Sequence, residues 1–186
     1  MPVFAHLLKD KMLRDSIKKH EGFGPSSYKD TKGHPTIYWG HKLLKGENLK
    51  GVNPESVLDI DLANAVKDAE YLFPGALAAT DNQKRALVEM AFNMGRTNLS
   101  GFTKMREAID AGEWKKVAVE ALDSQWAKRD VGKDRSSKIA QMLSGEQDQI
   151  ETAKEVQDLV EHKQLVPLKF PVLKFPGDVP PVNEEN

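Results

Sequence analysis

The spacing of hydrophobic residues divides the chain into a mixed N-terminal segment and a helical remainder. Early apolar residues recur every three to four positions, which predicts a helix that begins at Val3 or Asp10 and ends at His20. Glycine, proline and serine follow, and then come two short runs of strand-forming residues, 28–30 and 35–38. The pattern therefore predicts one helix followed by a small β-hairpin.

Helical spacing returns in the middle of the chain. Asn53 can cap a helix that has Pro54 in its first position and that ends at Phe73. Asp81 can cap the next helix, which we expect to end at Gly95. Further helices are expected at about 101–111, 113–127 and 134–144. The expected fold class is therefore α+β and mostly helical.

The last forty residues follow a different pattern. Residues 147–163 alternate charges with apolar residues at helical spacing, which predicts an amphipathic helix. Five prolines after residue 166 forbid a helix there, so residues 164–186 are expected to form an extended tail. That tail would pack on the preceding domain, 1–163, bind a partner surface, or remain disordered.

Composition narrows the class of protein. Charged residues make up 30% of the chain, and there is no run of eighteen apolar residues, so we expect no stable membrane insertion. The chain contains no cysteine, and its first residues carry charges too early for a signal peptide. We therefore expect a protein that folds in a reducing cytoplasm.

The net charge of −1 conceals an uneven distribution. Residues 146–186 carry a net charge of −5, which leaves +4 on the rest of the chain. A mildly basic body suits an acidic polymer or an envelope surface. The alternative is that both regions are ordinary solvated surface.

Three residues of the N-terminal segment form a candidate catalytic site: Glu21, Asp30 and Thr36. A carboxylate at a helix end and a second one at a hairpin can face each other across a groove, which suits acid–base cleavage of a glycosidic bond. If the turn centres on Gly33, Asp30 lies opposite Thr36, with Cβ atoms about 4.5–5.5 Å apart. We expect the two side chains to hold one water molecule between them.

Further motifs surround these residues at fixed distances. They are Glu21-Gly22, Tyr28-Lys29-Asp30, Thr36-Ile37-Tyr38-Trp39-Gly40-His41, Ala91-Phe92-Asn93-Met94-Gly95, Gly101-Phe102-Thr103, Trp126 and Asp134-Arg135. The set resembles the phage-type lysozymes of glycoside hydrolase family 24, whose pattern is E-G, Y-x-D and T-I-G-x-G-H. The resemblance covers about residues 12 to 145.

The resemblance implies a lysozyme-like, two-lobed fold. Its parts would be a small lobe at about 12–60, a linking helix at about 54–73 and a helical lobe at about 76–163. It also implies a muramidase that hydrolyses the β-1,4 bond between N-acetylmuramic acid and N-acetylglucosamine in peptidoglycan, with inversion and without a cofactor. The implied role is that of an endolysin, a monomer that binds no nucleic acid. It would wait in the cytoplasm of a Gram-negative host until a holin opens the way to the periplasm.

The resemblance also implies roles for the three candidate residues. Glu21 would be the general acid, Asp30 the general base, and Thr36 would position the attacking water. Inverting enzymes hold their two carboxyl groups roughly 6.5–9.5 Å apart to leave room for that water. The remaining carried-over residues would line the cleft (Gly40, Phe92, Asn93 and Arg135) or form a structural ion pair (His41 with Asp61).

Arg135 raises a physical question. The resemblance pairs it with Glu21, yet a nearby cation favours an ionised carboxylate, whereas a general acid must carry a proton. We expect Arg135 to orient Glu21 in the free enzyme, and bound substrate to exclude water and favour the protonated form. The five histidines have no close cluster of carboxylates around them, so we expect no metal site.

Tyr38 is a clear departure from the family, which usually has glycine at this position. Its ring would narrow the cleft, stack on a sugar, or pack between the lobes together with Trp39. Lys42 also replaces a residue that is usually apolar.

Two alternatives to a muramidase remain open. A peptidoglycan-binding or virion-associated module could keep the fold without activity, but it would not need both carboxylates. Lytic transglycosylation or chitin cleavage is the second alternative, and transglycosylases of this fold typically use one carboxylate, so Asp30 argues against it.

Overall fold

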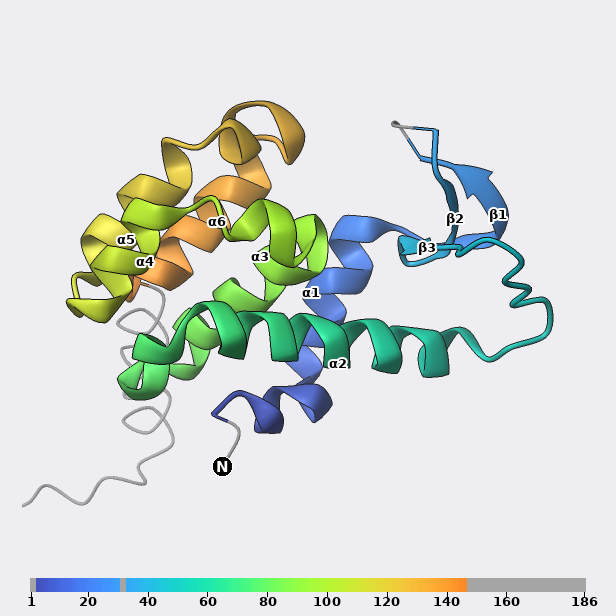
Figure 1. The fold of residues 1–186 in the computed structure, drawn as a ribbon, viewed down its shortest axis with the longest axis horizontal. Coiled ribbons are helices and arrows are strands. Elements are labelled where there is room, and N and C mark those ends of the chain that lie inside the picture. The colour runs from blue at the N-terminus through green and yellow to red at the C-terminus, as the bar shows by residue number, and fades with distance from the viewer. Residues whose placement is uncertain (1–2, 31–32, 147–186) are drawn as a thin grey trace, which may run out of the picture. The chain divides into compact units, whose positions relative to one another are not determined.

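The computed structural model describes residues 3–30 and 33–146. The chain divides into two compact units, residues 1–150 and 151–186, and the described residues all belong to the first. The predicted helix at 147–163 and the predicted tail at 164–186 lie outside the described residues. Figure 1 shows the arrangement of the labelled elements.

The N-terminus forms a short 3₁₀ helix, η1 (Ala5–Lys9), and then helix α1 (Lys11–Glu21). Asp10 caps α1 by accepting a hydrogen bond from the Leu13 backbone N–H at 2.8 Å. The helix ends where Gly22 takes a φ of 68°, a conformation that glycine adopts without strain. Glu21 is therefore the last residue of the helix.

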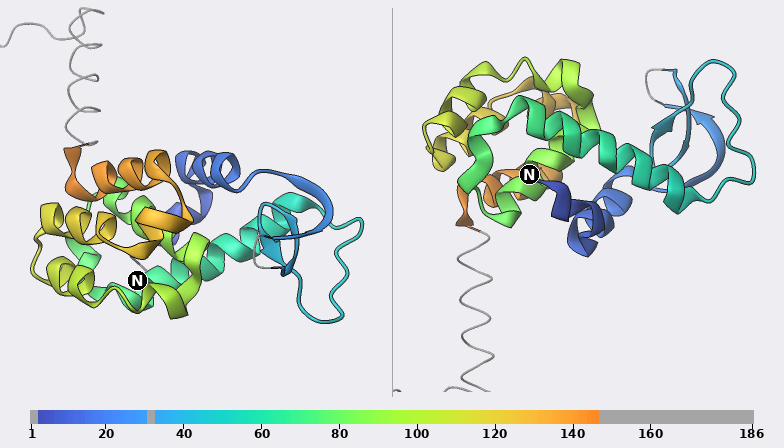
Figure 2. Two further views of the ribbon diagram at one scale, coloured as in Figure 1. Left: turned by 90° about the horizontal axis from the view of Figure 1, so that it is seen from above. Right: turned by 60° about the horizontal axis from the view of Figure 1, so that its bottom comes forward.

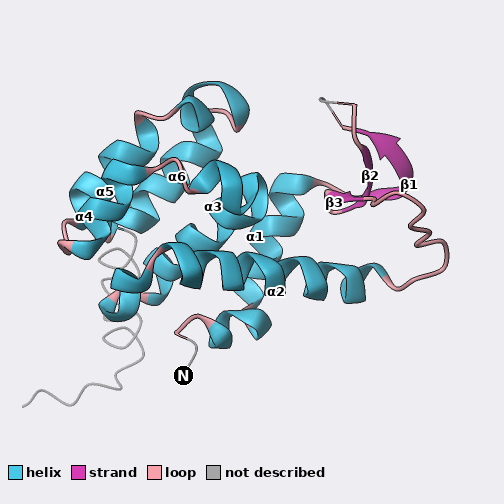
Figure 3. Cartoon of the chain, viewed as in Figure 1, coloured by secondary structure: helices cyan, strands magenta, loops and turns pink. Residues whose placement is uncertain are grey.

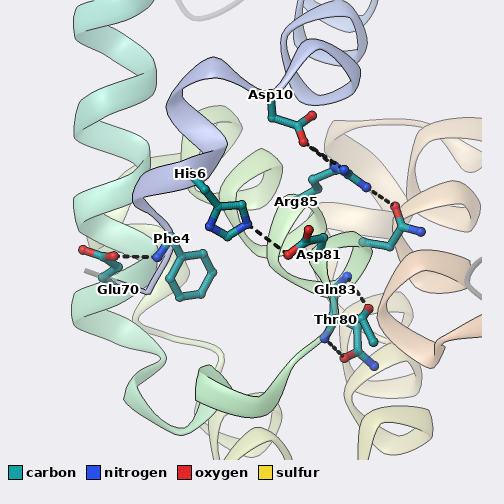
Figure 4. Close-up of polar contacts among 9 residues, drawn as sticks. Phe4, His6, Asp10, Glu70, Thr80, Asp81, Gln83 and Arg85 are labelled. Atoms are coloured by element: carbon teal, nitrogen blue, oxygen red, sulfur yellow. Dashed lines mark hydrogen bonds and ion pairs between the residues drawn. The ribbon is translucent and has the colours of Figure 1, made fainter. Parts of the chain in front are cut away.

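Polar contacts attach this N-terminal segment to the following helices (Figure 4). The backbone N–H of Phe4 donates to Glu70, and the ring of His6 lies 2.9 Å from Asp81. Arg85 donates to the helix cap Asp10. The start of α1 is thus attached at several points to the helices that follow.

A three-stranded antiparallel sheet follows, with β1 (Gly24–Lys29), β2 (Pro35–Tyr38) and β3 (His41–Lys42) in that order. The predicted strand at 35–38 is confirmed. β1 begins earlier than the predicted strand and has an irregular register between Gly24 and Tyr28. β3 was not predicted, because two residues are too few to show an alternating pattern.

The predicted pairing of Asp30 with Thr36 is wrong. Thr36 lies opposite Tyr28, and Asp30 lies opposite His34, to whose carbonyl it donates its backbone N–H at 2.9 Å. The reason is the place of Gly33 in the turn. Gly33 has a φ of 83° and occupies the last position of the loop, where a left-handed conformation is required. The prediction had placed Gly33 at the centre of the loop.

Helix α2 (Pro54–Leu72) begins as predicted, with Asn53 as its cap and Pro54 in its first position. A 3₁₀ helix, η2 (Pro74–Ala78), leads to α3 (Asp81–Leu99). The predicted cap Asp81 is wrong, because Thr80 caps α3 in a reciprocal capping box with Gln83. The predicted end at Gly95 appears as a break in helical geometry inside α3, where φ is 72°.

Four more elements complete the helical part: three helices near the predicted positions and a π-helical turn that was not predicted. They are α4 (Thr103–Asp110), α5 (Trp114–Leu122), a π-helical turn η3 (Trp126–Asp130) and α6 (Lys133–Ser144). The helix predicted at 113–127 ends earlier, at Leu122. Figure 3 shows the strands confined to one small region and helices elsewhere. The expected α+β, mostly helical fold is confirmed.

Two hydrophobic cores underlie this arrangement. The main core includes Leu62, Leu87, Met90 and Ile139 and belongs to the helices. A smaller core consists of Ile37, Tyr38 and Val57, and Trp39 packs against both cores. Helix α2 contributes to both, so it connects the sheet region to the helical lobe (Figure 2). Among the described residues, no helix is long and apolar enough to cross a membrane.

Candidate active site

Glu21 stands at the C-terminal end of α1, where the chain turns toward the sheet. Its Oε1 accepts hydrogen bonds from Arg135 Nη1 at 3.0 Å and from Asn93 Nδ2 at 3.4 Å. Its Oε2 faces Gly40, since a methyl group added to this glycine would lie 3.3 Å from that oxygen. The side chain is 18% exposed, so it is largely shielded from water while one oxygen is held by two donors.

The orientation of the Asn93 amide follows from its second neighbour. Trp126 Nε1 lies 2.9 Å from Asn93 Oδ1, and an indole N–H can only donate. The oxygen of the amide must therefore face Trp126, which leaves the NH₂ group for Glu21. Buried Trp126, in η3, thus fixes Asn93, in α3, which in turn donates to Glu21.

Arg135 lies in the first turn of α6 and is 8% exposed. Within the described part of the chain, its Nε and Nη2 atoms have no hydrogen-bond partner. Leaving buried donors unpaired costs free energy, so the residue is poorly explained by stability alone. Its contact with Glu21 is the described interaction that accounts for its position.

Asp30 and Thr36 both contact His34 in the hairpin. Asp30 Oδ1 accepts from the His34 backbone N–H at 2.8 Å, and its Oδ2 lies 3.1 Å from His34 Nδ1. The hydroxyl of buried Thr36 donates to the His34 carbonyl at 3.0 Å. The hairpin therefore holds both residues in fixed orientations, through a histidine that the sequence interpretation had not singled out.

His41 is bound on both ring nitrogens. Nδ1 lies 2.9 Å from Asp61, and Nε2 lies 3.4 Å from Glu47. Burial lowers the pKa of His41, but hydrogen bonds and charge from Asp61 and Glu47 outweigh it and raise the pKa above the usual value. The network joins β3, the following loop and α2. Asp61 was expected as a partner, while Glu47 was not.

A further carboxylate–histidine pair involves His20, the residue before Glu21. Glu89 of α3 is 1% exposed, and its Oε2 lies 3.3 Å from Nδ1 of His20. Because His20 precedes Glu21, this contact attaches the end of α1 to α3. The sequence offered little signal for it, since the two residues are far apart along the chain.

A pocket of about 650 Å³ is lined mostly by residues of the helical lobe, and Glu21, Asp30 and Thr36 are not among its lining residues. Asn93 and Trp126 line it, so the hydrogen-bonded chain that reaches Glu21 begins in its wall. Other lining residues include Lys42, Phe102, Glu120 and Asp123. Phe92, which was predicted to line the cleft, is partly buried and packs against the main core.

Tyr38 packs inside the small core, whereas its neighbour Trp39 is the residue that packs between the two cores. Tyr38 is 6% exposed, and its hydroxyl lies within 3.0 Å of the carbonyls of Leu49 and Val52. Its φ of 55° falls in the left-handed region, where glycine is usual. Trp39 packs between the two cores, with Lys18 Nζ at 4.8 Å from its ring centre.

The structure thus brings several of the predicted residues together. Gly40, Asn93 and Arg135 surround Glu21, and His41 meets Asp61, whereas Asp30 and Thr36 share His34 and are not direct cross-strand neighbours. Among the described residues, no group of three or more His, Asp or Glu side chains could hold a metal ion.

Comparison with known proteins agrees with this arrangement. A family model described as phage lysozyme matches residues 18–144. "Probable T4-type lysozyme 2" of Dictyostelium discoideum is 29% identical over 142 residues, which are 61% of this chain and 84% of that protein. "Probable T4-type lysozyme 1" of the same organism is 26% identical with the same coverage. "Pre-baseplate central spike protein Gp5" of Enterobacteria phage T4 is 27% identical, over 70% of this chain but only 27% of that protein. The chain therefore belongs to the phage lysozyme family and is a glycoside hydrolase, a lysozyme whose family implies peptidoglycan as its substrate.

Proposed function

We propose that the chain is a muramidase that hydrolyses the β-1,4 bond between N-acetylmuramic acid and N-acetylglucosamine with inversion of configuration. The observation that carries this proposal is the Glu21 carboxyl, with Oε1 held by Arg135 and Asn93 and Oε2 against Gly40. A single carboxyl held in one orientation, with one oxygen left for a proton, suits protonation of a glycosidic oxygen.

Glu21 acts as the general acid through Oε2. Because Oε1 already accepts two N–H donors, one of them cationic, a proton on the carboxyl is better placed on the other oxygen. Substrate in the cleft excludes water and disfavours the charged form, so the carboxyl can carry its proton when the bond breaks. Arg135 keeps the group oriented throughout.

Asp30 acts as the general base for the attacking water. The hydrogen bonds from His34 stabilise its ionised form, which a base requires. With the corrected register, Asp30 and Thr36 are diagonal neighbours, which lie about 7–8 Å apart with their Cβ atoms somewhat closer, and this leaves room for one water between the side chains. The Thr36 proton is engaged by the His34 carbonyl, so its oxygen accepts a hydrogen bond from that water.

The proposed biological role is host cell lysis as an endolysin. The enzyme would be a monomer that waits in the host cytoplasm and reaches the periplasm after a holin permeabilises the membrane, which would make it bacteriolytic and antimicrobial. A second role, a virion-associated lysozyme, is favoured by the likeness to a relative named as a central spike protein. Purified phage particles separate the roles, because only a virion-associated lysozyme would be found in them.

A turbidity assay on permeabilised Gram-negative cells tests the chemistry. Glu21→Gln and Asp30→Asn are expected to lower the rate of lysis by at least about a hundredfold, since each removes one partner of acid–base catalysis. Asp15→Asn changes an exposed carboxylate on α1 and is the matched control, expected to lyse like the wild type. Equal lysis by all four proteins would overturn the mechanism.

A further inference from the structure

His34 is the common partner of both proposed water-handling residues. Its backbone N–H and its ring each contact one oxygen of Asp30, at 2.8 and 3.1 Å. Its carbonyl accepts from the Asp30 backbone N–H and from the Thr36 hydroxyl. Four contacts of one residue therefore converge on Asp30 and Thr36.

We propose that the His34 side chain is a positioning residue of the hydrolytic reaction, which fixes the plane of the Asp30 carboxylate through an Nδ1–H bond to Oδ2. The inference rests on the proposed role of Asp30 as the general base. It adds a residue to the reaction that the family motif of E-G, Y-x-D and T-I-G-x-G-H does not contain.

The direction of the ring contact follows from the chemistry of the two groups. An ionised carboxylate has only acceptors, so the imidazole nitrogen that faces it must carry hydrogen, whether the ring is neutral or cationic. Bonds to both oxygens stop the carboxylate from rotating. Because a carboxylate oxygen has two lone pairs, one hydrogen bond to each oxygen does not by itself prevent the base from accepting a proton from water.

If Asp30 were only a residue that stabilises the turn, part of this geometry would remain unexplained. Aspartate at the start of a turn commonly accepts a backbone N–H, and the Oδ1 contact is of that kind. The contact of the ring with Oδ2 requires a side-chain donor and is not part of such a turn. Because the His34 side chain is 52% exposed, the ring contact contributes little to stability, so its removal should leave the fold intact.

Three substitutions of His34 in the full chain distinguish the effect of losing the N–H donor from the effect of losing the imidazole ring. His34→Asn keeps an N–H donor near the position of Nδ1, His34→Gln moves the amide to the position of Nε2, and His34→Leu keeps bulk without any donor. We expect kcat on purified peptidoglycan to fall about tenfold or more in the Leu and Gln variants, with KM within about twofold, because the base loses its orientation. The Asn variant should recover kcat to within about threefold of the wild type.

His6→Leu is the matched control. His6 is an exposed histidine, 46% exposed at its side chain, that contacts Asp81 at 2.9 Å and lies outside the site. Its kcat should equal that of the wild type, and all variants should unfold at wild-type denaturant concentrations.

The outcomes distinguish this inference from the proposed function. Wild-type kcat in His34→Leu, equal loss in the Asn and Leu variants, or a change confined to KM would each overturn the role of His34. If Asp30→Asn is inactive in the same assay, the proposal that Asp30 is the general base is supported, whatever the result for the His34 variants. Full activity of Asp30→Asn would instead overturn the proposed function itself.

Discussion

At the scale of single residues, the environment of Glu21 decides which chemistry is available. Two of the three groups around its carboxyl, Asn93 and Arg135, come from helices far along the chain, and Gly40 leaves room for the second oxygen. A buried ion pair such as Arg135 with Glu21 is weak grounds for stability, because desolvation offsets the attraction between the charges. The pair is better understood as orienting the acid.

Arg135→Ala should therefore lower kcat by roughly ten- to a hundredfold and change the pH–rate profile, because Glu21 loses its charged donor. Arg135→Lys keeps the charge but not the planar fork and should retain more activity. Arg129→Ala, at an exposed arginine, serves as the control. An unchanged rate and profile in Arg135→Ala would show that Arg135 does not orient the acid.

His41 makes stability depend on pH. Its folded-state pKa is raised, so the folded protein binds the proton more tightly than the unfolded chain does. The stabilisation is fully present below about pH 6.5, the ordinary value for histidine, and is lost as the pH rises through the raised folded pKa. Urea unfolding across this range should show the free energy of unfolding falling with pH.

Asp61→Asn removes the partner at 2.9 Å and should lower the free energy of unfolding at acidic pH by about 1–3 kcal/mol. The decline with rising pH should also become shallower in this variant. If the wild type and Asp61→Asn show parallel curves across the range, the network does not stabilise the folded protein.

At the scale of elements, the sequence predicted the start of α2 correctly but predicted the wrong strand register for the hairpin and the wrong cap for α3. Asn53 and Pro54 marked the start of α2 correctly, because capping depends on adjacent residues. The pairing of Asp30 failed because a glycine marks a turn without saying which turn position it occupies. Asp81 failed as a cap because Thr80 and Gln83 satisfy each other's backbone groups.

The corrected cap gives a prediction for α3. Thr80→Ala should lower the free energy of unfolding by about 1 kcal/mol, because it removes the hydroxyl that accepts from Gln83 N–H. Asp81→Ala, which removes an acid of the first turn, should have a smaller effect. Denaturant unfolding of both variants measures this, and a larger loss in Asp81→Ala would contradict the capping box.

Tyr38 gives a prediction for β2 and the loop that follows it. Tyr38→Phe removes a buried hydroxyl that lies near two backbone carbonyls and should cost about 1–3 kcal/mol, because those carbonyls lose a donor. Activity per folded molecule should stay unchanged, since the ring does not line the pocket. A loss of kcat without a loss of stability would place Tyr38 in the cleft after all.

At the scale of the whole described structure, the site lies where separate segments meet. Glu21 is 72 positions from Asn93 and 114 from Arg135, and no local pattern connects positions so distant. The family pattern supplied those residues, whereas His34, Glu47 and the buried pair of His20 and Glu89 lay outside it. Several residues around Glu21 were thus predictable from motifs, and the other supporting contacts required the folded structure.

The central claim is that two carboxyl groups hydrolyse the bond through a water that attacks from the face opposite the leaving group. The most direct measurement is the anomeric configuration of the first product, followed by NMR before mutarotation. Inversion at a β-linked sugar predicts an α reducing end. A β reducing end would indicate a covalent intermediate, and an anhydro-sugar would indicate transglycosylation; either result would contradict the account.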